Sequence, residues 1–128
     1  MLLLDSDIMV DVLRRYPPAI TWLNSRTDPV ALPGYVALEL YQGCRNKSEQ
    51  ERVRRVLSDF AIMWLSPEAC DQVLSMFASA SLSHNLGILD ALIGQLAVSI
   101  NAPLYTFNEK HYAAIPNLKS VQPYQKES

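Results

Sequence analysis

The run Met1-Leu2-Leu3-Leu4-Asp5-Ser6-Asp7 opens the chain with an apolar segment that ends in two carboxylates. Three consecutive leucines are typical of a short strand that is buried on both faces. The polar residues that follow offer N-cap groups for a helix over residues 8–15. The run therefore predicts a buried strand over residues 2–5 and a helix directly after it, with carboxylates at the junction.

Short apolar strands and helices then alternate to the end of the chain. Further strands are expected at residues 30–32, 61–65, 104–106 and 118–121, and further helices at 17–23, 35–44, 48–60, 66–81 and 88–100. This alternation predicts a parallel sheet covered by helices on both faces. We expect an α/β fold, a three-layer α/β/α arrangement with about five parallel strands, in a single domain over residues 1–128.

The composition narrows the class of protein. Hydrophobic residues make up 49% and charged residues 19% of the 128 residues, which is typical of a globular domain. No apolar run approaches the roughly 18 residues of a membrane span, and the first residues do not resemble a signal peptide. The two cysteines do not suggest a disulfide scaffold. We expect a cytoplasmic protein that does not bind membranes.

Two further acids interrupt apolar segments. Glu39 lies in Val36-Ala37-Leu38-Glu39-Leu40, and Asp90 lies in Gly87-Ile88-Leu89-Asp90-Ala91-Leu92-Ile93. An ionised acid that is removed from water is costly unless a positive or hydrogen-bonding group meets it. A divalent metal ion shared by several acids is the most economical partner.

The predicted strands bring these acids to one edge of the sheet. Asp5 ends the first strand, and Glu39 follows the second strand within the next helix. Asp90 lies near the start of the helix before the strand at 104–106, and Asn108 lies just beyond that strand. Ligands of parallel sheets bind outside the carboxyl ends of the strands. Oxygen donors favour Mg²⁺ or Mn²⁺, ions that activate water and stabilise charge on a phosphodiester.

Four segments of the chain carry a family pattern. They are Leu3-Leu4-Asp5-Ser6-Asp7, Leu38-Glu39-Leu40, Leu89-Asp90-Ala91-Leu92-Ile93-Gly94-Gln95-Leu96-Ala97 and Pro103-Leu104-Tyr105-Thr106-Phe107-Asn108-Glu109-Lys110-His111-Tyr112. In order and spacing they resemble the PIN-domain nucleases, and within them the VapC-type toxins. The resemblance covers nearly the whole chain. It implies a Mg²⁺- or Mn²⁺-dependent endoribonuclease, the toxin of a toxin–antitoxin pair, which forms a homodimer and binds a cognate antitoxin in its cleft.

The resemblance also implies roles for single residues. Asp5, Glu39 and Asp90 are expected to be the catalytic acids that bind the metal ion, with Asn108 at the fourth catalytic position. Many family members have an aspartate where Asn108 stands. Because an amide contributes no charge, a second metal ion is expected to bind more weakly here.

Neighbours of these acids receive supporting roles from the same resemblance. Thr106, two residues before Asn108, is expected to hold the site by hydrogen bonding. Ser6 or Asp7 is expected to support Asp5. The turn Pro33-Gly34-Tyr35-Val36 departs from the serine or threonine that the family often has before the second acid, which affects substrate positioning rather than the acids.

Two other functions fit parts of the sequence. A PIN fold that binds RNA or a protein without cutting is compatible with the uncharged Asn108. A phosphatase of the haloacid dehalogenase type also opens with an apolar strand and Asp-x-Asp, but the chain is short for that family and lacks its later acidic pair. We therefore favour the ribonuclease.

Surface residues leave alternatives open. The net charge of −2 does not by itself suggest nucleic-acid binding. The arginines of Glu51-Arg52-Val53-Arg54-Arg55 either contact RNA phosphates or an acidic partner, or form a solvated helix face. We expect Asp11 to be an exposed helix residue and Trp64 to pack in the core.

Overall fold

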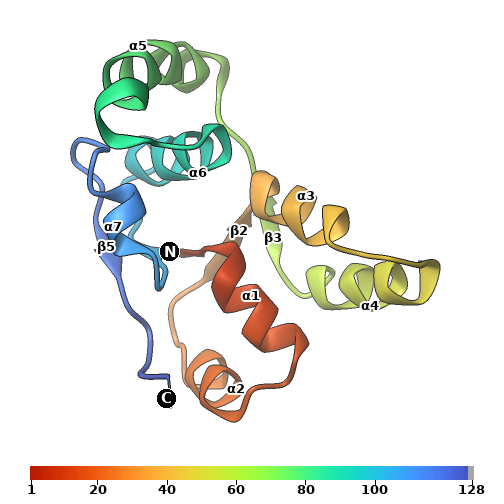
Figure 1. Cartoon of the computed structure of the whole chain (residues 1–128). Coiled ribbons are helices and arrows are strands. Elements are labelled where there is room, and N and C mark those ends of the chain that lie inside the picture. Colours follow the sequence, from red (N-terminus) through yellow and green to blue (C-terminus); the bar gives the residue numbers. More distant parts are fainter. Residues whose placement is uncertain (127–128) are drawn as a thin grey trace.

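The computed structural model describes residues 1–126, apart from the side chain of His84. Strands and helices alternate along the described chain, as the sequence predicts (Figure 1). The last two residues of the domain predicted over residues 1–128 lie outside the described residues, and the extent of this domain stays a prediction.

Five short strands form one parallel sheet in the order β3-β2-β1-β4-β5. They are β1 (Leu2–Leu4), β2 (Val30–Pro33), β3 (Ala61–Met63), β4 (Leu104–Tyr105) and β5 (Ser120–Val121). The central strand is β1, whose Leu3 pairs with Ala31 of β2 on one side and with Leu104 of β4 on the other. The predicted parallel sheet of about five strands is confirmed.

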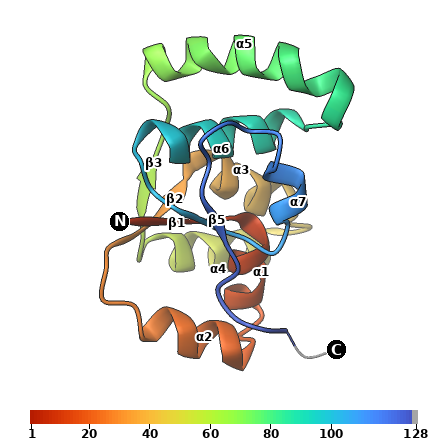
Figure 2. The ribbon, with the colours of Figure 1, turned by 90° about the vertical axis from the view of Figure 1, so that its left-hand side faces the viewer.

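Helices cover both faces of this sheet. They are α1 (Ser6–Leu13), α2 (Pro17–Asn24), α3 (Gly34–Gln42), α4 (Lys47–Leu57), α5 (Pro67–His84), α6 (Ile88–Ser99) and α7 (Glu109–Tyr112). Figure 2 shows α5 and α6 on one side of the sheet and α1, α2 and α4 on the other. The three-layer α/β/α arrangement predicted from the sequence is therefore confirmed.

Local signals in the sequence explain where several helices begin and end. The side-chain oxygens of Asn46 and Ser66 accept backbone N–H groups at the starts of α4 and α5. Helix α5 runs past Ser81, where the sequence predicted its end. It stops at Asn85, whose φ of 52° lies in the left-handed region that often terminates helices.

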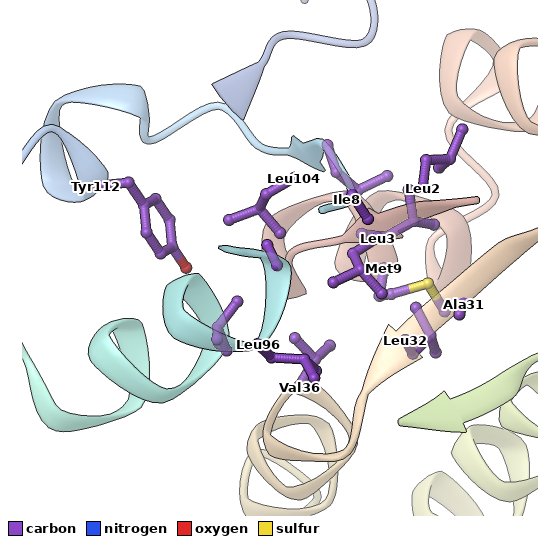
Figure 3. Close-up of a cluster of buried hydrophobic side chains, with 14 of the residues drawn as sticks. Leu2, Leu3, Ile8, Met9, Ala31, Leu32, Val36, Leu96, Leu104 and Tyr112 are labelled. Atoms are coloured by element: carbon purple, nitrogen blue, oxygen red, sulfur yellow. The ribbon is translucent and has the colours of Figure 1, made fainter. Parts of the chain in front are cut away.

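The hydrophobic core surrounds β1. Leu3 and Leu4 of this strand, Leu32 of β2 and Leu104 of β4 are all 0% exposed. Figure 3 shows Leu3, Leu32 and Leu104 within this core. Full burial of one leucine side chain stabilises a fold by about 1.5–3 kcal/mol relative to exposure. Burial of β1 therefore fixes the position of Asp5, the residue that follows it directly.

Two expectations about single side chains are wrong. Asp11 is only 7% exposed, because Tyr124 and Lys126 near the C-terminus cover its carboxylate, at 2.7 and 3.2 Å respectively. Trp64 is 53% exposed, and its ring packs edge-on against that of Tyr35 instead of entering the core. Both differences arise from contacts between segments that are distant in sequence.

The order of the strands places a switch point beside β1, and we call the region outside the carboxyl ends of β1 and β4 the acidic crevice. Strands β2 and β3 lie on one side of β1, and β4 and β5 lie on the other. At such a switch point the connections on the two sides lead away from each other, which leaves a crevice outside the carboxyl ends of the two central strands. The residues that follow β1 and β4 therefore mark the candidate site.

Candidate active site

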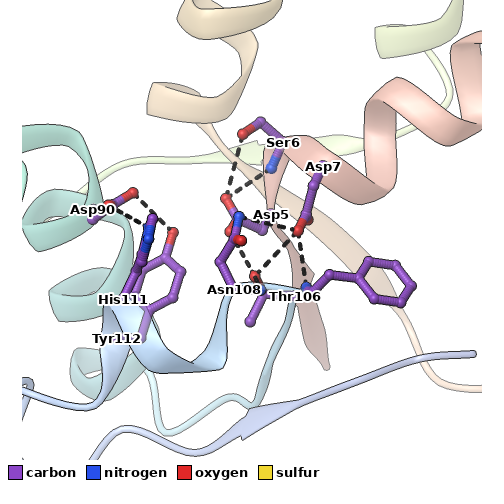
Figure 4. A network of polar contacts seen from close by, with 9 residues as sticks. Asp5, Ser6, Asp7, Asp90, Thr106, Asn108, His111 and Tyr112 are labelled. Atoms are coloured by element: carbon purple, nitrogen blue, oxygen red, sulfur yellow. Dashed lines mark hydrogen bonds and ion pairs between the residues drawn. The ribbon is translucent and has the colours of Figure 1, made fainter. Parts of the chain in front are cut away.

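Asp5 is held in this crevice by donors from two elements (Figure 4). As the N-cap of α1, it accepts the backbone N–H of Ser6 at Oδ1, at 2.8 Å. Its Oδ2 accepts the hydroxyl of Thr106, also at 2.8 Å. Asp5 is only 4% exposed, so these bonds fix the orientation of a buried carboxylate.

Asp7 extends the network on the same side of the crevice. Its Oδ2 accepts the backbone N–H of Phe107 at 2.8 Å and the side-chain amide of Asn108 at 3.4 Å. Burial and the neighbouring Asp5 raise the pKa of Asp7, whereas the N–H group of Phe107 lowers it. Asp7 therefore ties α1 to the segment that follows β4.

Thr106 stands at the centre of these contacts. It is fully buried, and while its hydroxyl donates to Asp5, its Oγ1 accepts the backbone N–H of Asn108 at 2.9 Å. Asn108 lies just before α7 and is exposed. The network therefore places the amide of Asn108 at the mouth of the crevice.

Glu39 reaches the crevice from α3. Burial raises the pKa of Glu39, and repulsion from Asp5 and then Asp90 raises it further. A hydrogen bond with the hydroxyl of Ser6 lowers this pKa. The electrostatic coupling means that α3 brings its carboxylate close to acids from two other elements.

Asp90 enters the crevice from the first turn of α6. Its Oδ1 accepts the hydroxyl of Tyr112 at 3.3 Å, and its Oδ2 lies 3.9 Å from Nδ1 of His111 (Figure 4). Burial and then Asp5 raise the pKa of Asp90, whereas His111 and Tyr112 lower it. The short helix α7 therefore supplies two groups that steady this acid.

His111 and Tyr112 are absent from the site residues predicted from the sequence. Both lie on α7, whose four residues are too few for a helical periodicity to be recognised. Tyr112 is 2% exposed, and burial together with Asp5 and Asp90 raises the pKa of its hydroxyl. Their only signal in the sequence is their place at the end of the family-like segment over residues 103–112.

The structure brings every sequence-predicted site residue to this one crevice. These residues are Asp5, Ser6, Asp7, Glu39, Asp90, Thr106 and Asn108. Hydrogen bonds join the residues that follow β1 and β4, and Ser6 links Glu39 to this network. Asp90 is linked to Asp5 electrostatically. The catalytic roles of these residues stay predictions.

The donor set of the crevice suits a hard divalent cation. Asp5, Glu39 and Asp90 offer carboxylate oxygens, the ligands that such ions prefer. Burial and then their mutual repulsion raise the pKa values of Glu39 and Asp90, and a bound cation relieves the repulsion. Within the described residues, no three His, Cys, Asp or Glu side chains already surround a common ion position. The chemistry of the residues therefore fits a divalent ion, at an open site.

Comparison with known proteins identifies the family. The family model for the PIN domain matches residues 2–116 of this chain. This chain belongs to the PIN-domain family. The PIN domain is 31% identical over 122 residues to ribonuclease VapC10 of Mycobacterium tuberculosis, a match that covers 93% of this chain and 91% of that protein. The resemblance to VapC-type PIN domains, inferred from the four sequence segments, is confirmed.

Two solved structures share the fold of this PIN domain. One is a toxin–antitoxin complex from Klebsiella pneumoniae, with a TM-score of 0.78, 25% identity, and coverage of 98% of this chain and 100% of that chain. The other is VapBC2 from Rickettsia felis bound to a DNA fragment from their promoter, with a TM-score of 0.81, 22% identity, and coverage of 94% and 97%. The PIN-like fold predicted from the sequence is therefore confirmed.

Proposed function

We propose that this PIN domain is a metal-dependent endoribonuclease and the toxin of a toxin–antitoxin pair. One observation carries the proposal: Asp5, Glu39 and Asp90 come from three separate elements and meet in one crevice, where burial and then repulsion from Asp5 raise the pKa of both other acids. An acidic crevice repels RNA unless a cation neutralises it. The similarity to a protein named ribonuclease VapC10 supports RNA as the substrate.

The proposed cation is Mg²⁺ or Mn²⁺, held by Asp5, Glu39 and Asp90. Nucleases of the PIN family generally depend on divalent metal ions. When bound, such an ion activates water and stabilises the charge that develops on a phosphodiester. Carboxylate donors favour these hard ions over zinc or copper.

The protein itself prepares this site before any ion binds. Ser6 and Thr106 each hold one oxygen of Asp5, so the carboxylate keeps one orientation. Tyr112 holds Asp90 in the same way. Because burial and then repulsion from Asp5 raise the pKa values of Glu39 and Asp90, protons compete with the ion for these acids, and ion binding is expected to weaken as the pH falls.

The proposed macromolecular partners are RNA, a cognate antitoxin and a second copy of this chain. The Klebsiella pneumoniae relative is part of a toxin–antitoxin complex, which supports the antitoxin. Leu74 and Leu82 of α5 are 74% and 98% exposed, and apolar residues this exposed are available for contact with a second copy.

A cytoplasmic location is also part of the proposal. Cys44 and Cys70 are both free thiols, which is compatible with a reducing compartment. Among the described residues, none of the helices combines the length and the apolar character needed to cross a membrane.

A non-cleaving module that binds RNA or a protein is the second candidate function. Asn108 favours this second candidate, because the residue at the fourth position is uncharged and its side-chain amide donates to Asp7. Such a module need not bind Mn²⁺ in the crevice, so metal binding and cleavage together separate the two candidates.

The test is cleavage of a pool of structured cellular RNAs by purified protein freed of any partner. We expect cleavage with Mg²⁺ or Mn²⁺, and none with a chelator or with the Asp90→Asn variant. The Asp71→Asn variant is the matched control, because it makes the same change at an exposed position of α5. No cleavage by folded wild-type protein with either metal would favour the binding module.

A further inference from the structure

Four arginines lie together where α1 ends beside α4. Arg14 and Arg15 follow the last residue of α1, and Arg52 and Arg55 lie on α4. All four side chains are exposed. Within the described residues, none of them forms an ion pair or a side-chain hydrogen bond with another residue. We call these four residues the arginine surface.

Other arginines of the same region are neutralised by acids. Arg45, before α4, pairs with Glu49 at 3.1 Å, and Arg54 of α4 pairs with Glu51. Arg54 lies on the same helix as two members of the arginine surface. The unpaired state of those two is therefore not a general property of arginines in this part of the chain.

Two cavities connect the arginine surface with Glu39, one acid of the crevice. The first, of about 320 Å³, lies between α1, α3 and α4, and its lining includes Glu39, Arg14 and Arg52. The second, of about 330 Å³, is lined in part by Arg15, Arg52 and Arg55. Arg52 lines both cavities, so their combined lining extends from Glu39 to Arg55.

The acids that line these cavities do not cancel the positive charge. Glu39 and Glu49 line the first cavity, where Glu39 marks the edge of the acidic crevice and Arg45 already pairs with Glu49. Asp59 is the acid in the lining of the second cavity, which also contains three arginines. A positive surface therefore adjoins the negative crevice, in a chain whose net charge is −2.

The backbone of Arg15 is held in an unusual conformation. Its φ of 58° lies in the left-handed region, whereas the other described non-glycine residues with positive φ are all asparagines, which tolerate it. Glycine is the residue that most readily occupies this region at the end of a helix. The chain instead keeps a cationic side chain here, at the edge of the second cavity.

We infer that the arginine surface binds phosphates of the RNA strand that enters the acidic crevice. This inference rests on the proposed ribonuclease function. A guanidinium group presents a planar fork of donors that matches the oxygens of a phosphate. Because the eight residues of α1 span about 12 Å, the arginines meet phosphates a few nucleotides away from the bond that is cut.

The salt dependence of RNA binding tests this inference. Binding of a fluorescently labelled single-stranded RNA is measured by anisotropy over a salt series, in chelator and in the Asp90→Asn background, so that no RNA is cut. The variant Arg52→Ala/Arg55→Ala is compared with Arg45→Ala/Arg54→Ala, which removes the same charge from paired arginines. Circular dichroism checks that both variants fold.

We expect the two double variants to differ in the slope of log RNA affinity against log salt concentration. Each phosphate contact to a single strand contributes about 0.7 to the slope of log affinity against log salt, so loss of Arg52 and Arg55 is expected to reduce it by roughly 1.4. The paired-arginine variant is expected to keep most of the wild-type slope. Equal slopes would overturn the inference and direct attention to an acidic protein segment as the ligand of these arginines.

Cleavage assays separate this inference from the proposed function. In the active background, the Arg52→Ala/Arg55→Ala variant is expected to cut a dinucleotide at the wild-type rate but a longer RNA more slowly. Normal cleavage of both substrates together with equal slopes would support the nuclease function and contradict RNA binding by the arginine surface. If no protein cuts either RNA but the variant still has a lower slope of log affinity against log salt, the phosphate contacts are supported and the nuclease function is contradicted.

Discussion

The hydroxyl of Thr106 donates to Oδ2 of Asp5 at 2.8 Å, although 101 positions separate the two residues. The bond joins the ends of β1 and β4, the two strands at the switch point of the sheet. Both residues are buried, so water does not compete for the carboxylate. The orientation of Asp5 therefore depends on the residue that follows β4.

Replacing Thr106 by valine is expected to weaken Mn²⁺ binding by about 10- to 100-fold. Partners that hold metal ligands in position typically contribute this much to metal affinity. Thr106→Ser keeps the donor and is expected to retain affinity within a few-fold of wild type. Isothermal titration calorimetry measures both, and a valine variant with wild-type affinity would rule out the orienting role of Thr106.

The metal-free protein is expected to lose stability as the pH rises from about 4 toward neutrality. The pKa values of Glu39 and Asp90 are raised above their ordinary values of 4.5 and 3.8. The folded state therefore holds protons more tightly than the unfolded chain. The free energy of unfolding falls as pH rises through this interval, and stays lower above it.

The variants Glu39→Gln and Asp90→Asn test this pH dependence. In chelator at pH 7 each is expected to be more stable than wild type, by less than about 1 kcal/mol because water partly screens both carboxylates. The gain is expected to shrink as the pH falls and to vanish below the ordinary pKa values of 4.5 for Glu39 and 3.8 for Asp90. Urea denaturation across pH measures it, and a gain of constant size at all pH values would contradict the electrostatic explanation.

Replacing Asn108 by aspartate is expected to have opposite effects with and without metal. The new carboxylate stands beside Asp7, whose Oδ2 lies 3.4 Å from Nδ2 of Asn108, so the metal-free variant is expected to melt at a lower temperature. Mn²⁺ is expected to raise its melting temperature more than that of wild type. Asn108→Ala removes the amide without adding charge and serves as the control in thermal unfolding. A metal-induced shift no larger than that of wild type would be evidence against an ion near residue 108.

The C-terminal segment is expected to stabilise the site through Asp11. Tyr124 donates its hydroxyl to the buried Asp11 at 2.7 Å, and its ring packs on Phe107, whose N–H holds Asp7. Hydrogen bonds to charged groups contribute about 1.5–3 kcal/mol, so Tyr124→Phe is expected to lose an amount in this range. A double-mutant cycle with Asp11→Asn, measured by urea denaturation, is expected to show coupling, and simple additivity of the two changes would contradict the contact.

The strands and the gathering of the three acids were predictable because each leaves a local signal, whereas the catalytic role of these acids stays a prediction. Short apolar runs between turn residues mark β1 to β4, and their alternation with helices indicates the parallel sheet. Asp5, Glu39 and Asp90 stand out because each interrupts or ends an apolar segment. Their meeting in one crevice follows from the general rule that parallel strands gather ligands at their carboxyl ends.

Features that depend on distant contacts were not predictable from local patterns. The pattern of α1 predicts one exposed face, on which Asp11 was placed. The fold instead brings Tyr124, 113 positions away, into hydrogen-bond contact with its carboxylate. Trp64 directly follows the edge strand β3, and at this edge its ring packs against Tyr35 and not in the core. Helix α7 is too short to show a helical periodicity, so its contacts with Asp90 were not predictable from the sequence.

The central claim is that the acidic crevice holds the divalent ion of a nuclease, and Mn²⁺ binding tests it most directly. Electron paramagnetic resonance of free Mn²⁺ measures binding to wild type, Glu39→Gln, Asp90→Asn and the control Glu68→Gln, which changes an exposed residue of α5. We predict that wild type and the control bind Mn²⁺ equally, and that the two crevice variants bind it at least about tenfold more weakly. Equal binding by all four proteins, or no binding by wild type, would contradict the claim.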